Sequence, residues 1–181
     1  MENLKELIDK NTIVVFDIET TGLRNDIITS EFDYIIEVGA VKIVRGKTTE
    51  KFSSFVSCPE KLAEYIVTLT GITNEDLNDA STVDKVLKDF YEFCKGCILV
   101  AHNLPFDYRF ICYYGERHGI YFNNQKLDTI ALAKEILNGK VENYKLSTLA
   151  NYFKINFTHH RALYDAETTA KILLELAKLC Y

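Results

Sequence analysis

The chain has 181 residues, of which 48% are hydrophobic and 26% are charged. This composition is typical of a globular protein, and the length suits one domain with its own core better than two. The formal net charge is −5, from 21 basic and 26 acidic side chains, which disfavours a protein that holds duplex nucleic acid through many phosphate contacts. Binding of a smaller part of a nucleic acid, such as one strand end, remains compatible with this charge, because bound divalent cations can supply positive charge locally.

The first third of the chain predicts three strands in succession after a helix-compatible start. Residues 1–10 are charged and contain no apolar stretch like that of a secretory signal. Residues 13–16 form a continuous apolar run, which is typical of a strand buried on both faces. Residues 34–44 are rich in β-formers, and a turn at 45–47 leads into a third strand over 48–57. Because no apolar run approaches the roughly 20 residues of a membrane-spanning helix, we expect a cytoplasmic protein without a membrane partner.

The rest of the chain alternates helices and strands. Helices are predicted over residues 61–69, in a short segment capped within 73–76, and over 81–94, 105–117, 129–137, 146–153 and 166–178. Residues 98–101 and 127–129 are predicted strands, with Asn103 able to cap the helix between them and Pro105 able to start it. Strands that first follow one another and then alternate with helices predict one α/β domain with a mixed sheet, over residues 1–181.

Cys94 and Cys97 form a C-x-x-C pair among five cysteines. A zinc site would need a second pair, which the sequence lacks. A redox pair would need its thiol at the N-terminus of a helix, whereas the predicted helix ends near Gly96. We therefore expect reduced and mostly buried thiols.

Asp17 and Glu19 stand two residues apart at the end of the first predicted strand. Side chains at this spacing project from the same face of a sheet, at the strand end where open α/β sheets place their sites. Two carboxylates held together there repel one another and are costly without a cation. Their hard oxygens favour Mg²⁺ or Mn²⁺. A solvated strand end is the alternative interpretation of this pair taken alone.

Asp107 falls in the first turn of the helix predicted after the strand 98–101, where the helix dipole favours a carboxylate. It shares a face with Phe110, Ile111 and Tyr114, at offsets of three, four and seven. A carboxylate on an apolar stripe needs a partner, and a metal ion would serve. Stabilisation of the helix start is the simpler alternative.

Asp165 lies on the inward stripe of the last predicted helix, with Thr168, Thr169 and Ile172 at helical offsets. His160 precedes that helix. A lone histidine is more often structural, but beside metal-bound carboxylates an imidazole that titrates near neutrality is the natural general base for water. His159 is a competitor by residue type.

Together these residues belong to three ordered motifs: D-x-E-T-T-G-L from Asp17, H-N-x-x-F-D from His102 and H-R-A-x-x-D-A from His160. They resemble the motifs of the DEDDh, or DnaQ-like, 3′→5′ exonuclease superfamily, and most of all the proofreading exonuclease domains and subunits of bacterial replicative DNA polymerase III. The resemblance covers residues 12–178, with support from 34–42, 69–73 and 127–129. It implies an RNase H-like α/β fold with a central mixed five-stranded sheet flanked by helices.

The resemblance also implies two-metal phosphodiester hydrolysis with Mg²⁺ or Mn²⁺. Asp17 would bridge both ions, while Glu19 and Asp165 would hold the ion that binds the nucleophilic water. Asp107 would support the second ion, and His160 would deprotonate the water. His160 is chosen over His159 by its five-residue spacing to Asp165, which comes from the resemblance.

The terminal nucleotide is expected to lie against the ends of the first two motifs. The backbone of residues 20–23 would hold it, with Gly22 permitting close approach. Leu23 and Phe106 are candidates to wedge against bases or stack on them. The other candidate substrate contacts are Thr20, Thr21, Ile72, His102 and Asn103.

The expected substrate is the 3′ end of single-stranded or frayed DNA, in proofreading or repair, with a DNA polymerase as a candidate partner. An exoribonuclease that trims tRNA or short oligoribonucleotides is an open alternative, because the sequence does not reveal how a 2′-OH is treated. An inactive nucleic-acid-binding module would more readily have lost one of the carboxylates. The slightly long connection 24–33 carries Asp26, Glu31 and Asp33, acids that would discourage long duplex substrates.

Overall fold

A central five-stranded sheet organises the protein, whose computed structural model describes residues 3–26, 31–157 and 161–180. The strand order is β5 (Lys47–Phe55), β4 (Ile35–Val44), β1 (Thr12–Thr20), β6 (Ile98–Ala101) and β7 (Lys126–Asp128). β4 is antiparallel to both of its neighbours, whereas β6 is parallel to β1 and to β7. The predicted RNase H-like fold with a mixed five-stranded sheet is thereby confirmed.

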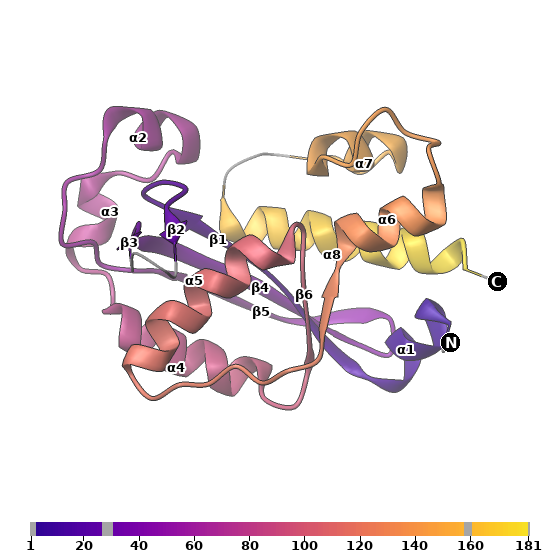
Figure 1. The fold of residues 1–181 in the computed structure, drawn as a ribbon, viewed down its shortest axis with the longest axis horizontal. Coiled ribbons are helices and arrows are strands. Elements are labelled where there is room, and N and C mark those ends of the chain that lie inside the picture. Colours follow the sequence, from indigo (N-terminus) through magenta and orange to yellow (C-terminus); the bar gives the residue numbers. More distant parts are fainter. Residues whose placement is uncertain (1–2, 27–30, 158–160, 181) are drawn as a thin grey trace.

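Both faces of the sheet are covered by helices (Figure 1). One core lies between the sheet and α1 (Leu4–Lys10), α6 (Thr129–Leu137), α7 (Leu146–Tyr152) and α8 (Ala162–Lys178). The other core lies on the opposite face, against α4 (Val83–Cys94) and α5 (Leu104–Arg117). In the described part of the chain, no helix is both long and apolar enough to cross a membrane.

β1 lies in the middle of the sheet and its side chains alternate between the two cores. Ile13 and Val15 face α8, whereas Val14 and Phe16 face α4 and α5, and all four are fully buried. Burying a side chain of this kind contributes about 1.5–3 kcal/mol, so the register of β1 is strongly fixed. This explains why the predicted strand appears in the sequence as a continuous apolar run.

A small group of elements flanks the end of β1 (Figure 1). It contains the two-stranded hairpin of β2 (Asn25–Asp26) and β3 (Glu31–Phe32), which the sequence did not predict. It also contains α2 (Glu64–Thr70) and α3 (Asn74–Asn78), which share a third apolar core with β4. The predicted cap of α3 is confirmed, since Thr73 and Asp76 form a reciprocal capping box.

The predicted start of α8 was wrong, whereas that of α5 was close to the observed one. α8 begins at Ala162, four residues before the predicted start, because Glu37 of β4 accepts a hydrogen bond from the Ala162 backbone N–H at 3.0 Å. α5 begins at Leu104, one residue before the predicted start, and Asn103 is its N-cap residue as predicted. The side chain of Asn103 makes no capping hydrogen bond, and its backbone is left-handed with φ of 67°. The start of α8 therefore depends on a tertiary contact that local propensity does not include.

The C-x-x-C pair lies in the core. α4 ends at Cys94, both Cys94 and Cys97 are buried, and all five cysteines are free. Burial raises the pKa of Cys94 to about 12 and raises that of Cys97. Both thiols therefore stay protonated near neutral pH, as the prediction of structural cysteines requires.

Candidate active site

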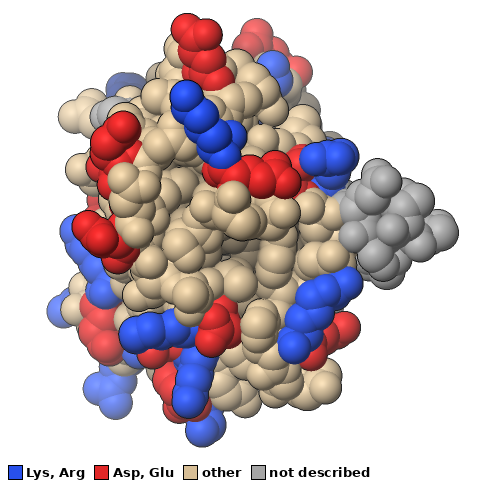
Figure 2. All heavy atoms as spheres, turned by 90° about the vertical axis from the view of Figure 1, so that its left-hand side faces the viewer, with Lys and Arg blue, Asp and Glu red and all other residues tan. Residues whose placement is uncertain are grey.

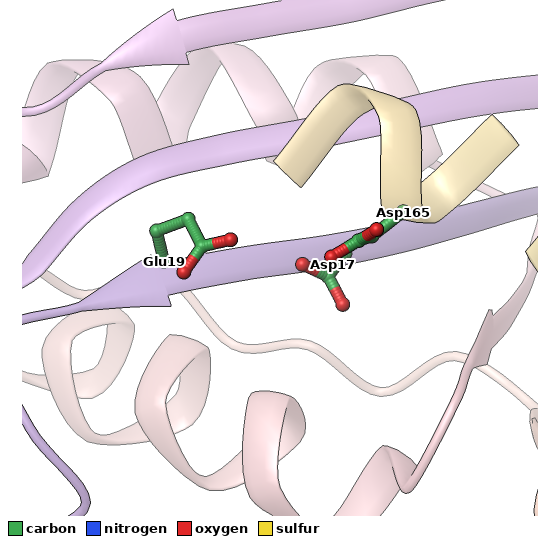
Figure 3. A group of neighbouring side chains, drawn as sticks. All are labelled: Asp17, Glu19 and Asp165. Atoms are coloured by element: carbon green, nitrogen blue, oxygen red, sulfur yellow. The ribbon is translucent and has the colours of Figure 1, made fainter. Parts of the chain in front are cut away.

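Three carboxylates converge between β1 and α8. Asp17 and Glu19 have the same parity along β1 as Ile13 and Val15, so they face α8. Asp165, in the first turn of α8, points back toward them (Figure 3). One oxygen from each carboxylate lies within 4.8 Å of the others, close enough for a single cation to touch all three.

Asp107 reaches the same region from α5. β6 pairs with β1 at residues 13–15, so the following edge of β1 is open to the start of α5. Asp107 Oδ1 accepts a hydrogen bond from the Ile18 backbone N–H at 3.1 Å, and the carboxylate is only 3% exposed. Its charge acts on Asp17, where it is the largest cause of a raised pKa after burial. The four acids singled out in the sequence are thus brought together.

The cluster is electrostatically costly without a cation. Burial raises the pKa of Asp17 well above its usual value, and the charges of Asp107, Asp165, Glu19 and Glu37 raise it further. The pKa of Glu19 rises to about 8 through burial and the neighbouring carboxylates, and burial is the main cause that raises the pKa of Asp107 to about 8. A divalent cation would offset this repulsion, and an all-oxygen donor set suits a hard ion.

Glu37 lies beside the carboxylate cluster and was not predicted from the sequence as a site residue. It lies in β4 directly opposite Glu19 and is 1% exposed. The guanidinium of Arg161 donates to both of its oxygens, with Nη2–Oε1 at 3.0 Å and Nε–Oε2 at 3.2 Å. The Ala162 N–H is the further donor. The available signals were an acid inside the apolar strand 34–44 and an arginine inside the third motif.

Gly39 permits the close approach of α8 to the sheet. It pairs with Asp17 across the β1–β4 ladder. A Cβ atom at this position would lie 2.1 Å from the backbone N of Leu163 and 2.3 Å from the carbonyl carbon of Ala162. Only glycine therefore leaves room for the start of α8, and with it for Asp165 to reach Asp17.

Asp33 shapes the loop that follows β1. Its Oδ2 accepts from the Arg24 backbone N–H at 2.7 Å, and its Oδ1 accepts from Arg24 Nε at 3.0 Å and Nη2 at 2.8 Å. A Cβ on Gly22 would lie 2.4 Å from Asp33 Oδ2. The idea that Asp33 serves to discourage duplex substrates is therefore wrong, because its charge is buried and paired with Arg24. The side chains of Asp26 and Glu31 lie outside what the structure describes.

A groove of about 520 Å³ begins where β1 ends. Leu23 is 80% exposed and Tyr65 of α2 is 62% exposed, and both line it. The Tyr65 hydroxyl donates to the carbonyl of Thr21 at 3.2 Å, which joins α2 to the loop. Figure 2 shows the side of the molecule that carries α2, α3 and α4, where Lys and Arg are interspersed with Asp and Glu. Leu23 and Tyr65 thus give this groove exposed apolar and aromatic surface of the kind on which bases can stack.

The remaining candidate contacts differ in accessibility. Ile72 is 1% exposed and belongs to the core beneath α2 and α3, so its assignment as a substrate contact is corrected. His102 is half-buried, with Nδ1 at 2.9 Å from Thr129 Oγ1. Phe106 is half-buried against Phe110, with ring centroids 5.0 Å apart. His160 lies outside the described residues.

Comparison with known proteins identifies relatives of the chain. Residues 14–173 match the exonuclease family, of the RNase T type. The chain is 43% identical over 164 residues to the PolC-type DNA polymerase III of Caldanaerobacter subterraneus subsp. tengcongensis and 41% identical over 175 residues to that of Bacillus subtilis. These matches cover 90% and 95% of this chain, but the chain spans only 11% and 12% of the length of those polymerases.

Solved structures share the fold. The nuclease domain of 3′hExo, a DEDDh family member bound to rAMP, has a TM-score of 0.77 and 20% identity, with 93% of this chain and 92% of that chain covered. Exonuclease X in complex with 5′ overhanging duplex DNA has a TM-score of 0.69 and 24% identity, with 92% and 91% covered. The chain belongs to the exonuclease family, as its motifs predicted.

Proposed function

We propose that residues 1–181 act as one exonuclease domain that removes nucleotides from the 3′ end of single-stranded or frayed DNA. The observation that carries this proposal is the convergence of Asp17, Glu19 and Asp165, whose carboxylates each place one oxygen within 4.8 Å of the others at the end of β1. Asp107 is held close by through its hydrogen bond from the Ile18 amide. The PolC-type relatives support DNA as the substrate, proofreading as the role and a DNA polymerase as the partner.

The acids would hold two divalent cations, Mg²⁺ or Mn²⁺. Asp17, Glu19 and Asp165 offer oxygens close enough to share one ion, and Asp107 would support the second. The raised pKa values of Asp17, Glu19 and Asp107 fit a site that is completed by positive charge. When bound, the ions would stabilise the negative charge that develops on the attacking and leaving oxygens.

The reaction would be an in-line displacement at the terminal phosphate. His160 would accept a proton from the attacking water, as an imidazole with a pKa near neutrality can. A new bond forms between the water oxygen and phosphorus, and the bond to the 3′ oxygen of the preceding nucleotide breaks; that oxygen leaves with the bonding electron pair and takes up a proton from solvent water. The products are a nucleoside 5′-monophosphate and a strand with a new 3′-hydroxyl. The loop 20–23 would hold the terminal nucleotide, with Leu23 exposed at the groove to wedge against a base.

The test is digestion of a single-stranded DNA oligonucleotide labelled at one end. A 3′ label should be released at once as mononucleotide, whereas a 5′ label should give a ladder of shortening strands. EDTA and Asp17→Ala should each abolish both patterns. Asp89→Ala, which removes an exposed acid of α4, is the matched control and should be fully active. Undiminished release in EDTA or by Asp17→Ala would refute the proposed mechanism.

RNA is the second candidate substrate. It is favoured by the similarity in fold to the 3′hExo nuclease domain, whose structure contains rAMP. The choice depends on whether the groove tolerates a 2′-OH on the terminal nucleotides. DNA and RNA oligonucleotides of the same sequence should be compared by kcat/KM, and we expect the DNA strand to be cleaved more efficiently. A higher kcat/KM for RNA would reverse the assignment.

A further inference from the structure

Glu37 of β4 and Arg161, at the start of α8, form an ion pair that takes no part in the proposed hydrolysis. Glu37 is buried in β4, and both of its oxygens accept hydrogen bonds from Arg161: Oε1 from Nη2 at 3.0 Å and from Nε at 3.3 Å, and Oε2 from Nε at 3.2 Å. The guanidinium carbon of Arg161 also lies 5.1 Å from the ring centroid of Phe55 in β5. The side chain of Arg161 is thus held by an acid from one strand and an aromatic ring from the next.

This pair is connected to Asp165 through the backbone of α8. Glu37 Oε2 accepts from the Ala162 N–H at 3.0 Å, so the carboxylate satisfies one of the amides that a helix leaves unpaired at its start. The carbonyl of Arg161 accepts from the Asp165 N–H at 3.0 Å. The first turn of α8 therefore connects Arg161, which Glu37 holds on β4, to Asp165 of the carboxylate cluster.

Arg161 also compensates the negative charge of the buried Glu37 carboxylate. Glu37 lies opposite Glu19 across the β1–β4 ladder, next to the cluster that would hold the metal. With the guanidinium fork and the Ala162 amide on its oxygens, Glu37 is fully engaged by donors and is not offered to a cation. Glu19, by contrast, shares close oxygens with Asp17 and Asp165.

We propose that Glu37 and Arg161 are positioning residues of the carboxylate site: the pair fixes the first turn of α8 on β4 and thereby sets where Asp165 stands relative to Asp17 and Glu19. This inference rests on the proposed function, because it assigns the pair a role in metal binding and turnover. Neither residue is assigned to contact the substrate.

The experiment compares variants of the pair with a second sheet-to-α8 ion pair. Glu37→Gln keeps an oxygen for the Ala162 amide but removes the charge, Arg161→Met removes the fork, and Arg161→Lys keeps only the charge. The control is Lys51→Ala, which breaks the ion pair between Lys51 of β5 and Glu167, two positions after Asp165 in α8. Lys51 is 59% exposed, so that pair should contribute little.

Three quantities are measured for each purified chain: the Mn²⁺ dissociation constant by calorimetry, kcat and KM on a single-stranded DNA oligonucleotide, and the melting temperature. Glu37→Gln and Arg161→Met should weaken Mn²⁺ binding about tenfold and lower kcat about 10- to 100-fold, as loss of residues that orient metal ligands does, with KM changed by less than about twofold. Arg161→Lys should fall between Arg161→Met and the wild type. Lys51→Ala should match the wild type in all three quantities.

Unchanged Mn²⁺ affinity and kcat in folded Glu37→Gln would overturn the inference, as would an equal loss in Lys51→Ala. If Arg161→Met does not fold, Glu37→Gln and Arg161→Lys decide the question by the same criteria. The wild-type measurement distinguishes failure of the proposed function from failure of the positioning role. A wild-type chain that neither binds Mn²⁺ nor cleaves the strand would refute the proposed function, whereas an active wild type with equally active variants refutes only the positioning role.

Discussion

Asp107 Oδ1 accepts a hydrogen bond from the backbone N–H of Ile18 at 3.1 Å, which ties the start of α5 to β1 between Asp17 and Glu19. The bond satisfies an amide that the sheet leaves open, since β6 pairs with β1 only at residues 13–15 of the described ladder. A single carboxylate therefore has two functions. One of its oxygens accepts the hydrogen bond of the Ile18 amide, and its charge adds to the carboxylate cluster of Asp17, Glu19 and Asp165.

Substitutions at Asp107 should separate these two functions. Asp107→Asn retains an oxygen for the Ile18 amide and removes a buried charge, so we expect the metal-free protein to be at least as stable as the wild type. We also expect at least a tenfold loss of kcat, a loss in the range typical for a perturbed metal site. Asp107→Ala leaves the buried amide without its acceptor, so its free energy of unfolding should be about 1–3 kcal/mol lower than that of Asp107→Asn. Urea unfolding in EDTA and single-turnover cleavage measure the two effects. Equal destabilisation by Asn and Ala would contradict the structural function.

The stability of the metal-free protein should fall as the pH rises. The folded-state pKa values of Glu19 and Asp107 are raised to about 8, from ordinary values of 4.5 and 3.8. Between those limits the folded state binds more protons than the unfolded state, so the free energy of unfolding decreases with increasing pH. The stabilisation is complete below the ordinary values and is lost as the pH passes through about 8.

Urea unfolding in EDTA at several pH values between 5 and 9 measures this effect. Saturating Mn²⁺ should reverse the decline, because an ion that binds only the folded state stabilises it. Glu19→Gln should make the profile flatter, since its neutral side chain does not titrate. A metal-free stability that increases between pH 6 and 8 would show that the carboxylates are not held in the folded state as described.

The sequence predicted the sheet and the main site because both follow from short-range periodicity. The apolar run at residues 13–16 predicted that β1 is buried on both faces, and the two-residue spacing predicted that Asp17 and Glu19 project from one face. The helical phase likewise predicted that Asp107 and Asp165 point inward, and both are buried. Regular backbone geometry carries these inferences without any knowledge of the tertiary contacts.

The features that the sequence did not predict depend on residues far apart in the chain. Glu37 and Arg161 are separated by 124 positions, and no local pattern indicates that they pair. Gly39 looks like an ordinary glycine in a strand until α8 is in place above it. The hairpin of β2 and β3 is only two residues long on each side, too short to produce an alternating pattern. The prediction for Ile72 failed in the opposite way. Its position in the sequence suggested a contact with the substrate, but its side chain is buried in the core.

Gly39→Ala should damage both the fold and the metal site. The added Cβ would lie 2.1 Å from a backbone atom of α8, which has no flexible side chain to move aside. We expect a loss toward the upper end of the roughly 1–3 kcal/mol typical of overpacking, together with weaker Mn²⁺ binding because Asp165 is displaced. Gly71→Asn is the control: Gly71 has φ of +70° with no neighbouring atom within 4 Å, and asparagine tolerates this conformation. A similar loss in both variants would contradict the steric explanation.

His160→Ala should separate proton transfer from metal binding. If His160 accepts the proton of the attacking water, its removal should lower kcat about 10²- to 10⁴-fold, the usual contribution of a general base. The Mn²⁺ dissociation constant should stay close to that of the wild type, because the oxygens of Asp17, Glu19 and Asp165 remain. The pH profile is a further measure, since the rise of kcat through the histidine pKa should disappear in the variant. His159→Ala, which removes the neighbouring imidazole, is the matched control and should keep both kcat and its pH dependence. Mn²⁺ affinity that falls as sharply as kcat in His160→Ala would mean that the imidazole is a metal ligand instead of the base.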